Sequence, residues 1–168
     1  YNGSWGSPLN GNSDKFKGSD TFDGINPANG VVLYYELQKL KDSTVITLDI
    51  LDSKGKTIRT ISSEKDPTYK PHNGGGAPPA PLLSKKEGLN RFVWDMEYPI
   101  MPGIPGVYIE AGFGGHSVSP GTYTFKLMVD GQTVSTTGII KELPTYETIS
   151  GQYEEYDAFM TVAEQELT

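Results

Sequence analysis

The apolar residues of this chain fall in short runs that are separated by turn-forming residues. Val31–Leu37 follows the turn-rich stretch 26–30, which indicates a buried strand. Residues 44–51 and 57–61 are rich in β-branched side chains, and Asp52-Ser53-Lys54-Gly55 separates them with turn formers. This pattern predicts a β-hairpin in which residues 57–61 alternate regularly between the two faces of the sheet.

A further strand and a second hairpin are predicted later in the chain. Residues 88–95 have the apolar content of a strand, and Trp94 is the large side chain expected to anchor the core. Residues 122–129 and 133–140 flank Asp130-Gly131, a pair that tolerates the positive φ angles of a tight hairpin turn. The chain is therefore predicted to be all-β.

Three segments are predicted along the chain. Residues 1–30 are rich in Gly, Asn, Ser and Asp and cannot build a core, so we expect an extended N-terminal strap that is partly disordered. Residues 31–141 are expected to form an immunoglobulin- or fibronectin III-like antiparallel β-sandwich of about seven strands. Residues 145–168 are expected to form a C-terminal amphipathic helix.

The helix prediction rests on apolar residues that recur every three or four positions. Thr145 is the expected N-cap, and Glu147 falls in the first turn, where the helix dipole favours a negative charge. The residues of the apolar stripe are Ile149, Tyr153, Tyr156, Met160, Ala163 and Leu167.

Two loop regions rich in Gly and Pro interrupt the strands. Residues 62–88 contain the stretch 71–81, whose composition neither a helix nor a central strand would accept. A loop of this length is either functional or an insertion, and we favour an insertion. The second region, 98–119, includes the glycine-rich loop 111–116.

Composition and charge exclude several classes of function. The 168 residues include no cysteine, which excludes disulfides, Cys-ligated zinc and thiol catalysis. The net charge of −7 belongs to residues 142–168, which carry carboxylates and no Lys or Arg. This balance argues against nucleic acid and anionic membranes as partners. No apolar run approaches the ~20 residues that a membrane span needs, so we expect no membrane insertion.

Catalytic and metal-binding patterns are weak. Asp95 and Glu97 would share one face of a strand, as a glycosidase pair would, but Asp95 is better explained as a strand end that bonds local backbone amides. His72 and His116 are the only imidazoles, and a metal site would require their separate loops to meet. We therefore expect no enzyme activity, no catalytic residue, no cofactor and no metal.

Aromatic and histidine side chains in the loops and on the helix are the candidate contacts for a ligand or partner. Exposed rings of this kind stack on sugars, so carbohydrate is the alternative ligand to a protein partner. The candidates are Trp5, Tyr69, His72, Phe113, His116, Tyr153 and Tyr156.

Three blocks of the chain together carry a family resemblance. Phe22–Tyr35, Gly88–Pro99 and Pro120–Leu127 resemble the C-terminal region of bacterial sortilin-like, BNR-repeat β-propeller proteins, often labelled glycosyl hydrolases. The last two blocks, with Asp52–Thr60, are also similar to the immunoglobulin-like domain of the flagellar hook-capping protein. The resemblance covers residues 20–165 and has no counterpart for the loops 71–81 and 111–116.

The resemblance implies an immunoglobulin-like sandwich that follows a β-propeller on the same polypeptide. Any catalytic site of such a protein would lie in the propeller, and no catalytic residue transfers to this chain. The chain starts at Tyr1 without a leader peptide, so we expect a processed piece of a longer protein that is periplasmic, outer-surface or secreted.

These observations predict a non-catalytic accessory or interaction domain that packs on the upstream propeller or on another partner. The alternative is a carbohydrate-binding module of a glycoside hydrolase-like protein. Buried rings together with an exposed apolar helix face would favour the first function, and solvent-facing coplanar rings would favour the second.

Overall fold

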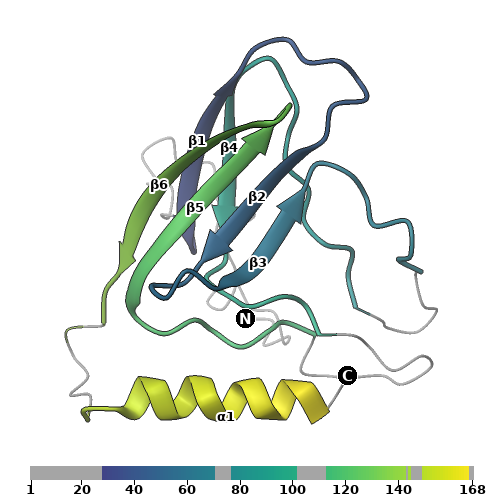
Figure 1. The fold of residues 1–168 in the computed structure, drawn as a ribbon. Coiled ribbons are helices and arrows are strands. Elements are labelled where there is room, and N and C mark those ends of the chain that lie inside the picture. The colour runs from purple at the N-terminus through teal and green to yellow at the C-terminus, as the bar shows by residue number, and fades with distance from the viewer. Residues whose placement is uncertain (1–27, 71–76, 102–112, 143, 145–148, 167–168) are drawn as a thin grey trace, which may run out of the picture.

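The computed structural model describes residues 28–70, 77–101, 113–142, 144 and 149–166 (Figure 1). The predicted strap at 1–30 lies almost entirely outside these residues. Within them the chain is mostly β, with strands β1 (Val31–Leu37), β2 (Ile46–Leu51), β3 (Thr57–Ser62), β4 (Gly88–Trp94), β5 (Gly121–Val129) and β6 (Gln132–Ile140) followed by helix α1 (Gln152–Glu166).

The strands form two antiparallel sheets, an arrangement consistent with a β-sandwich. One sheet pairs β1 with β4, and the other has the order β3-β2-β5-β6. Figure 1 shows the two-stranded sheet behind the four-stranded one, and buried side chains from both sheets form one core. The described residues thus contain six strands, compared with the predicted total of about seven.

The core is centred on Trp94, as the sequence predicts. The indole ring makes edge-to-face contacts with Tyr123 and Phe125, with ring centroids 5.4 and 5.7 Å apart. Ile46 and Ile50 of β2 are fully buried in the same core. Such aromatic pairs contribute about 0.5–1.5 kcal/mol each beyond the area that they bury.

Both predicted hairpins are confirmed. In the turn between β2 and β3, Asp52 Oδ1 accepts hydrogen bonds from the backbone N–H groups of Lys54 and Lys56, at 2.9 and 2.8 Å. Between β5 and β6, Asp130 and Gly131 have φ angles of 49° and 77°. Positive φ at both central positions gives the turn a twist that matches the twist of the strands.

The predicted regular alternation in residues 57–61 is wrong. The β2–β3 register shifts between Ile50 and Leu51, which leaves Ile58 as an extra residue in β3. Because of this bulge, Ile58 and Arg59 are both buried although they are consecutive. Ile58 and Ile61 would face opposite sides of a regular strand, and the extra residue allows both to reach the core.

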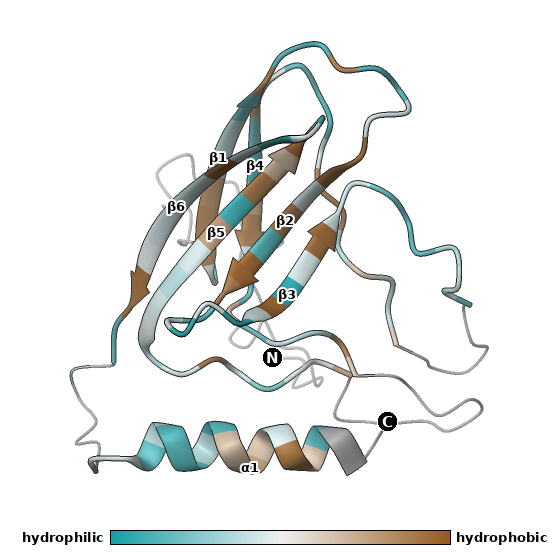
Figure 2. Ribbon diagram, viewed as in Figure 1, coloured by the Kyte–Doolittle hydropathy of each residue, from teal (hydrophilic) through white to brown (hydrophobic). Residues whose placement is uncertain are grey.

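Helix α1 lies across one end of the two sheets (Figure 1). The predicted N-cap, Thr145, lies outside the described residues, and α1 begins at Gln152. Gly151 has a φ of +86°, which a right-handed helix cannot continue through, and its carbonyl accepts the first helical hydrogen bond from Glu155 N–H at 3.1 Å. The apolar residues of α1 gather in its C-terminal half (Figure 2).

Candidate functional site

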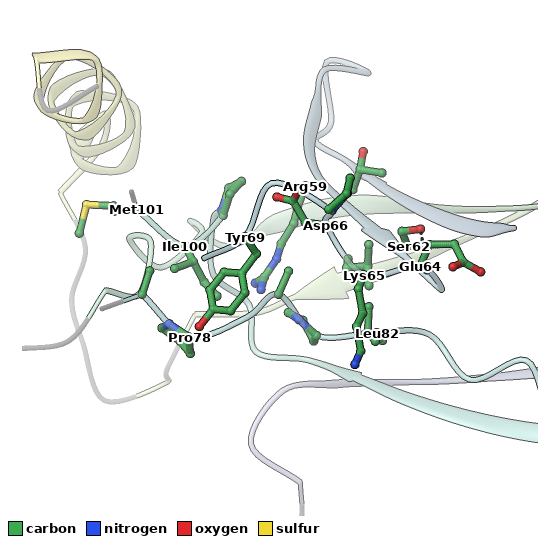
Figure 3. Close-up of a pocket in the computed structure, with 17 residues that line it drawn as sticks. Arg59, Ser62, Glu64, Lys65, Asp66, Tyr69, Pro78, Leu82, Ile100 and Met101 are labelled. Atoms are coloured by element: carbon green, nitrogen blue, oxygen red, sulfur yellow. Dashed lines mark hydrogen bonds between the residues drawn. The ribbon is translucent and has the colours of Figure 1, made fainter. Parts of the chain in front are cut away.

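A groove of about 570 Å³ lies beside β3, the outermost strand at one edge of the four-stranded sheet (Figure 3). The segments 64–69, 77–82 and 99–101 form its other walls. Leu83 N–H donates a hydrogen bond to Ser62 O at 2.9 Å, which fastens the second of these segments against the end of β3.

The groove is lined mainly by proline and aliphatic side chains. Figure 3 shows the Tyr69 ring in the middle of the groove, with its hydroxyl toward Pro78. Proline fixes its own φ angle and has no N–H donor, so these walls are stiff and offer apolar contact. The apolar lining residues include Pro67, Pro78, Pro81, Leu82, Ile100 and Met101.

Arg59 is the buried charge at the base of the groove. Its Nη1 donates to Asp95 Oδ1 at 2.6 Å and to Glu97 O at 3.1 Å. Asp95 Oδ1 also accepts from Glu97 N–H at 3.2 Å, so the predicted role of Asp95 in bonding a local backbone amide is confirmed. The guanidinium therefore ties β3 to the segment after β4, and the Asp95 carboxylate, which is partly exposed to water, neutralises its charge.

Two acidic residues of the groove, Glu64 and Asp66, have hydrogen-bond partners of their own. Lys85 Nζ bonds to Glu64 Oε1 at 2.9 Å. Asp66 accepts hydrogen bonds from the hydroxyl and the N–H of Thr68, at 2.6 and 2.8 Å. These two bonds, of which the one from the hydroxyl has the larger effect, hold the pKa of the Asp66 carboxyl below its ordinary value.

The opposite side of segment 95–101 contacts α1 through a buried histidine. Tyr98 N–H donates to His116 O at 3.0 Å, and the two rings stack with centroids 3.9 Å apart. His116 Nδ1 lies 2.6 Å from Glu164 Oε1. Since an ionised carboxylate only accepts hydrogen bonds, Nδ1 carries the proton. Nε2 is buried and has no hydrogen-bond partner among the described residues.

A second polar contact holds the preceding turns of the helix. Ser119 Oγ donates to Asp157 Oδ1 at 2.7 Å, and the Tyr156 ring meets His116 edge-on at 5.8 Å. Burial, with a smaller contribution from the charge of Asp157, raises the pKa of Tyr98 and of Tyr156. The helix therefore docks on the segment that leads into β5 through polar as well as aromatic contacts.

The predicted contact residues fall in different places. Tyr69 lines the groove, and Phe113 is buried. His116 and Tyr156 meet at the helix junction, and Tyr153 is half-buried on α1. Trp5 and His72 lie outside the described residues. Contact with a ligand or partner stays a prediction for all seven residues.

Several residues of these surfaces were not singled out by the sequence. Asp157 and Glu164 are seven positions apart and share one face of α1, next to the predicted apolar stripe. That spacing is a possible signal of a docking role. The sequence pattern did not separate these two carboxylates from the other acidic residues of 142–168. The sequence offers one signal for Arg59, because it is the only charged residue in a strand that contains the apolar residues Ile58 and Ile61.

The described residues were also compared with the requirements of a metal site and of a membrane span. They contain no group of three or more His, Cys, Asp or Glu side chains arranged to hold a metal ion. In the same part of the chain, no helix has the length and apolar character needed to cross a bilayer.

Comparisons of the chain with protein-family models, with curated proteins and with solved structures found no significant match.

Proposed function

We propose that this chain is a non-catalytic interaction domain of a larger extracytoplasmic bacterial protein, and that the groove beside β3 binds the β-propeller domain of the same polypeptide. The observation that carries the proposal is the lining of the groove, which is proline-walled and aliphatic around the neutralised Arg59. The immunoglobulin- or fibronectin III-like identity of the two sheets belongs to the same proposal, and their antiparallel order supports it.

The groove has the properties of a surface for apolar side chains. Each Leu- or Phe-sized side chain that it removes from water contributes about 1.5–3 kcal/mol to binding. Stiff proline walls reduce the conformational entropy that association costs. The charged residues of the groove, Glu64, Lys65 and Asp66, fit the polar border that surrounds such a contact.

The exposed residues of α1 also support an interaction domain. Phe159 and Val162 are 71% and 59% exposed on the helix, and Ile149 precedes it at 77%. Of the candidate contact rings, Phe113 is buried, whereas Tyr69 and Tyr156 are partly exposed. The exposed apolar residues of the helix therefore favour a docking domain, while the candidate rings are divided between the two functions.

A pair of matched variants tests the groove. Leu82 lies in the groove, whereas Leu89 is an exposed leucine of β4 outside it. In Leu82→Asp, a carboxylate would lose its water on binding, so we expect affinity for the separately produced propeller domain to fall at least about tenfold, measured by isothermal titration calorimetry. Leu89→Asp should bind like the wild type. Equal affinity of the two variants, or no binding by the wild-type chain, would contradict the proposal.

The second candidate function is a carbohydrate-binding module. The observation in its favour is the partly exposed Tyr69 ring in a groove that the carboxylates of Glu64 and Asp66 also line, a combination that can stack on and hydrogen-bond a sugar. A thermal-melt screen against polysaccharides and oligosaccharides decides between the two. A saturable rise in Tm that Tyr69→Ala abolishes would replace the interaction domain with this function.

A further inference from the structure

A second hollow region lies between β1 and β6, on the other edge of the molecule from the groove. It consists of two adjoining hollows of about 330 and 300 Å³, which share the side chains of Glu36, Leu127 and Val134. We call this region the β1–β6 cleft. The β1–β6 cleft is separate from the surface to which the proposed function is assigned, because none of its residues line the groove.

The cleft exists because the two sheets differ in width. Two strands face four, and β6 is the outermost strand of the wider sheet. A Cβ atom at Gly138 would lie 3.1 Å from the Phe125 ring, so Gly138 faces the core. Val134 is four residues away on the same strand and shares that face, yet it is 64% exposed. The inner face of β6 is therefore uncovered by the described strands.

The cleft runs along the edges of both strands. Four consecutive residues of β1, Leu33 to Glu36, line it, as do three of β6, Val134 to Thr136. Alternate side chains of a strand point to opposite faces, so consecutive residues meet in one hollow only along the edge, where the backbone groups lie. In the described part of the chain, β1 pairs on its other edge with β4, and β6 with β5.

An unpaired strand edge is a template for a further strand. Natural proteins usually protect such edges with Lys, Pro or inward-pointing charges. The sequence of β6 has no charged residue and no proline, and Glu36 is the only charge in β1. These edges thus lack the common safeguards against strand addition.

The side chains of the cleft specify the chemistry of an added strand. Its floor is apolar, so side chains at alternate positions of the strand must be apolar too. The charged residues that line it, Glu36 and Asp130, are both acidic, which favours a basic residue at that end of the strand. The apolar lining residues are Leu33, Leu37, Leu40, Leu48, Phe125, Leu127, Val129 and Val134.

We propose that the β1–β6 cleft binds a β-strand from a partner polypeptide. The strand adds to the edge of β1 that no described strand occupies, inserts alternate apolar side chains over Leu127 and Val134, and carries a Lys or Arg toward Glu36 and Asp130. Backbone hydrogen bonds to β1 supply affinity, and the alternate side chains supply specificity.

The test mixes the full chain with a synthetic peptide. In this peptide Val alternates with Thr, and Lys stands at both ends. Fluorescence anisotropy of the labelled peptide gives Kd, and hydrogen exchange shows which amides it protects. Val134→Lys places a charge in the cleft, so we expect Kd to rise at least about tenfold. Ile139→Lys is the matched control, because Ile139 is 71% exposed on β6 and lines neither hollow.

We expect the peptide to protect the β1 amides from hydrogen exchange. This protection should be lost in Val134→Lys and retained in Ile139→Lys. If Val134→Lys unfolds, Val134→Ser tests the same site without the charge. A peptide with proline in place of its central Val should not bind, because it lacks a backbone donor. Three results would overturn the proposal: no binding by the wild type, protection of β3 in place of β1, and a dimer of the chain alone that Val134→Lys dissociates.

Discussion

Tyr123 joins apolar packing and polar bonding in one side chain. Its ring packs edge-on against Trp94, and its hydroxyl donates to Ser119 O at 2.5 Å. Burial is the main reason that its pKa is raised from 10.0 to about 12, with smaller contributions from Tyr98 and nearby carboxylates. The neutral form is thus favoured by folding, because a buried phenolate would lose its water.

This shift predicts a loss of stability at high pH. A group whose pKa is raised on folding contributes stability that is complete below pH 10 and disappears as pH rises toward 12. We expect the free energy of unfolding, measured by urea denaturation, to fall over this range. Tyr123→Phe should flatten part of that fall and cost about 1 kcal/mol at pH 7, from the lost hydrogen bond. Tyr34→Phe, at an exposed tyrosine, is the control, and equal slopes for the two variants would contradict the assignment.

At the scale of elements, α1 depends on its contacts with the sheets. An isolated helix of its length, 15 residues, is marginal in water. Its residues Asp157 and Glu164 bond to Ser119 and His116, while Phe159 stays exposed. The helix is therefore expected to open more readily than the strands when these polar contacts are removed.

His116→Ala tests this dependence. The variant removes both the ring that stacks on Tyr98 and the group that bonds to Glu164, which we expect to cost about 2 kcal/mol. Hydrogen exchange of the α1 amides should accelerate, while that of β2 should change only with global stability. Phe159→Ala on the exposed face should change stability by less than about 0.5 kcal/mol. Equal acceleration in α1 and β2 would show that the helix does not open separately.

At the scale of the whole molecule, Arg59 links the two sheets. Its side chain extends from β3 of the wider sheet to Asp95, which follows β4 of the narrower one. Arg59 Nη1 lies 2.6 Å from Asp95 Oδ1. The two partners differ in exposure, because the Arg59 side chain is buried and that of Asp95 is about half exposed. Removing one partner or the other therefore has unequal consequences.

The loss of Asp95 should be the more costly change. Asp95→Ala leaves a buried guanidinium without its counter-charge, so we expect a cost of about 3 kcal/mol. Arg59→Met keeps much of the buried volume and leaves Asp95 in contact with water, so its cost should be clearly smaller. Urea denaturation of the two variants measures the difference. The opposite order would show that the ion pair does not behave as a buried charge with an exposed partner.

Local chemistry allowed much of the fold to be predicted. Asp130-Gly131 requires a backbone conformation that few other pairs accept, so the sequence alone predicted that hairpin. Apolar periodicity predicted the strands around Trp94 and a C-terminal helix, but it placed the helix start at Thr145. The actual start depends on the left-handed conformation of Gly151, which periodicity does not report.

What the sequence determined by itself was the set of strands, the turns between them and the helical period, because these depend on residues close together in the chain. The tertiary structure alone decided the bulge at Ile58, the bond between His116 and Glu164, the groove beside β3 and the cleft between β1 and β6. The bulge depends on the pairing of β3 with β2 and on what each face of β3 packs against, and the other three depend on residues far apart in sequence, such as the 48 positions that separate His116 from Glu164. These contacts are set by how the two sheets and the helix pack together, which no local pattern encodes.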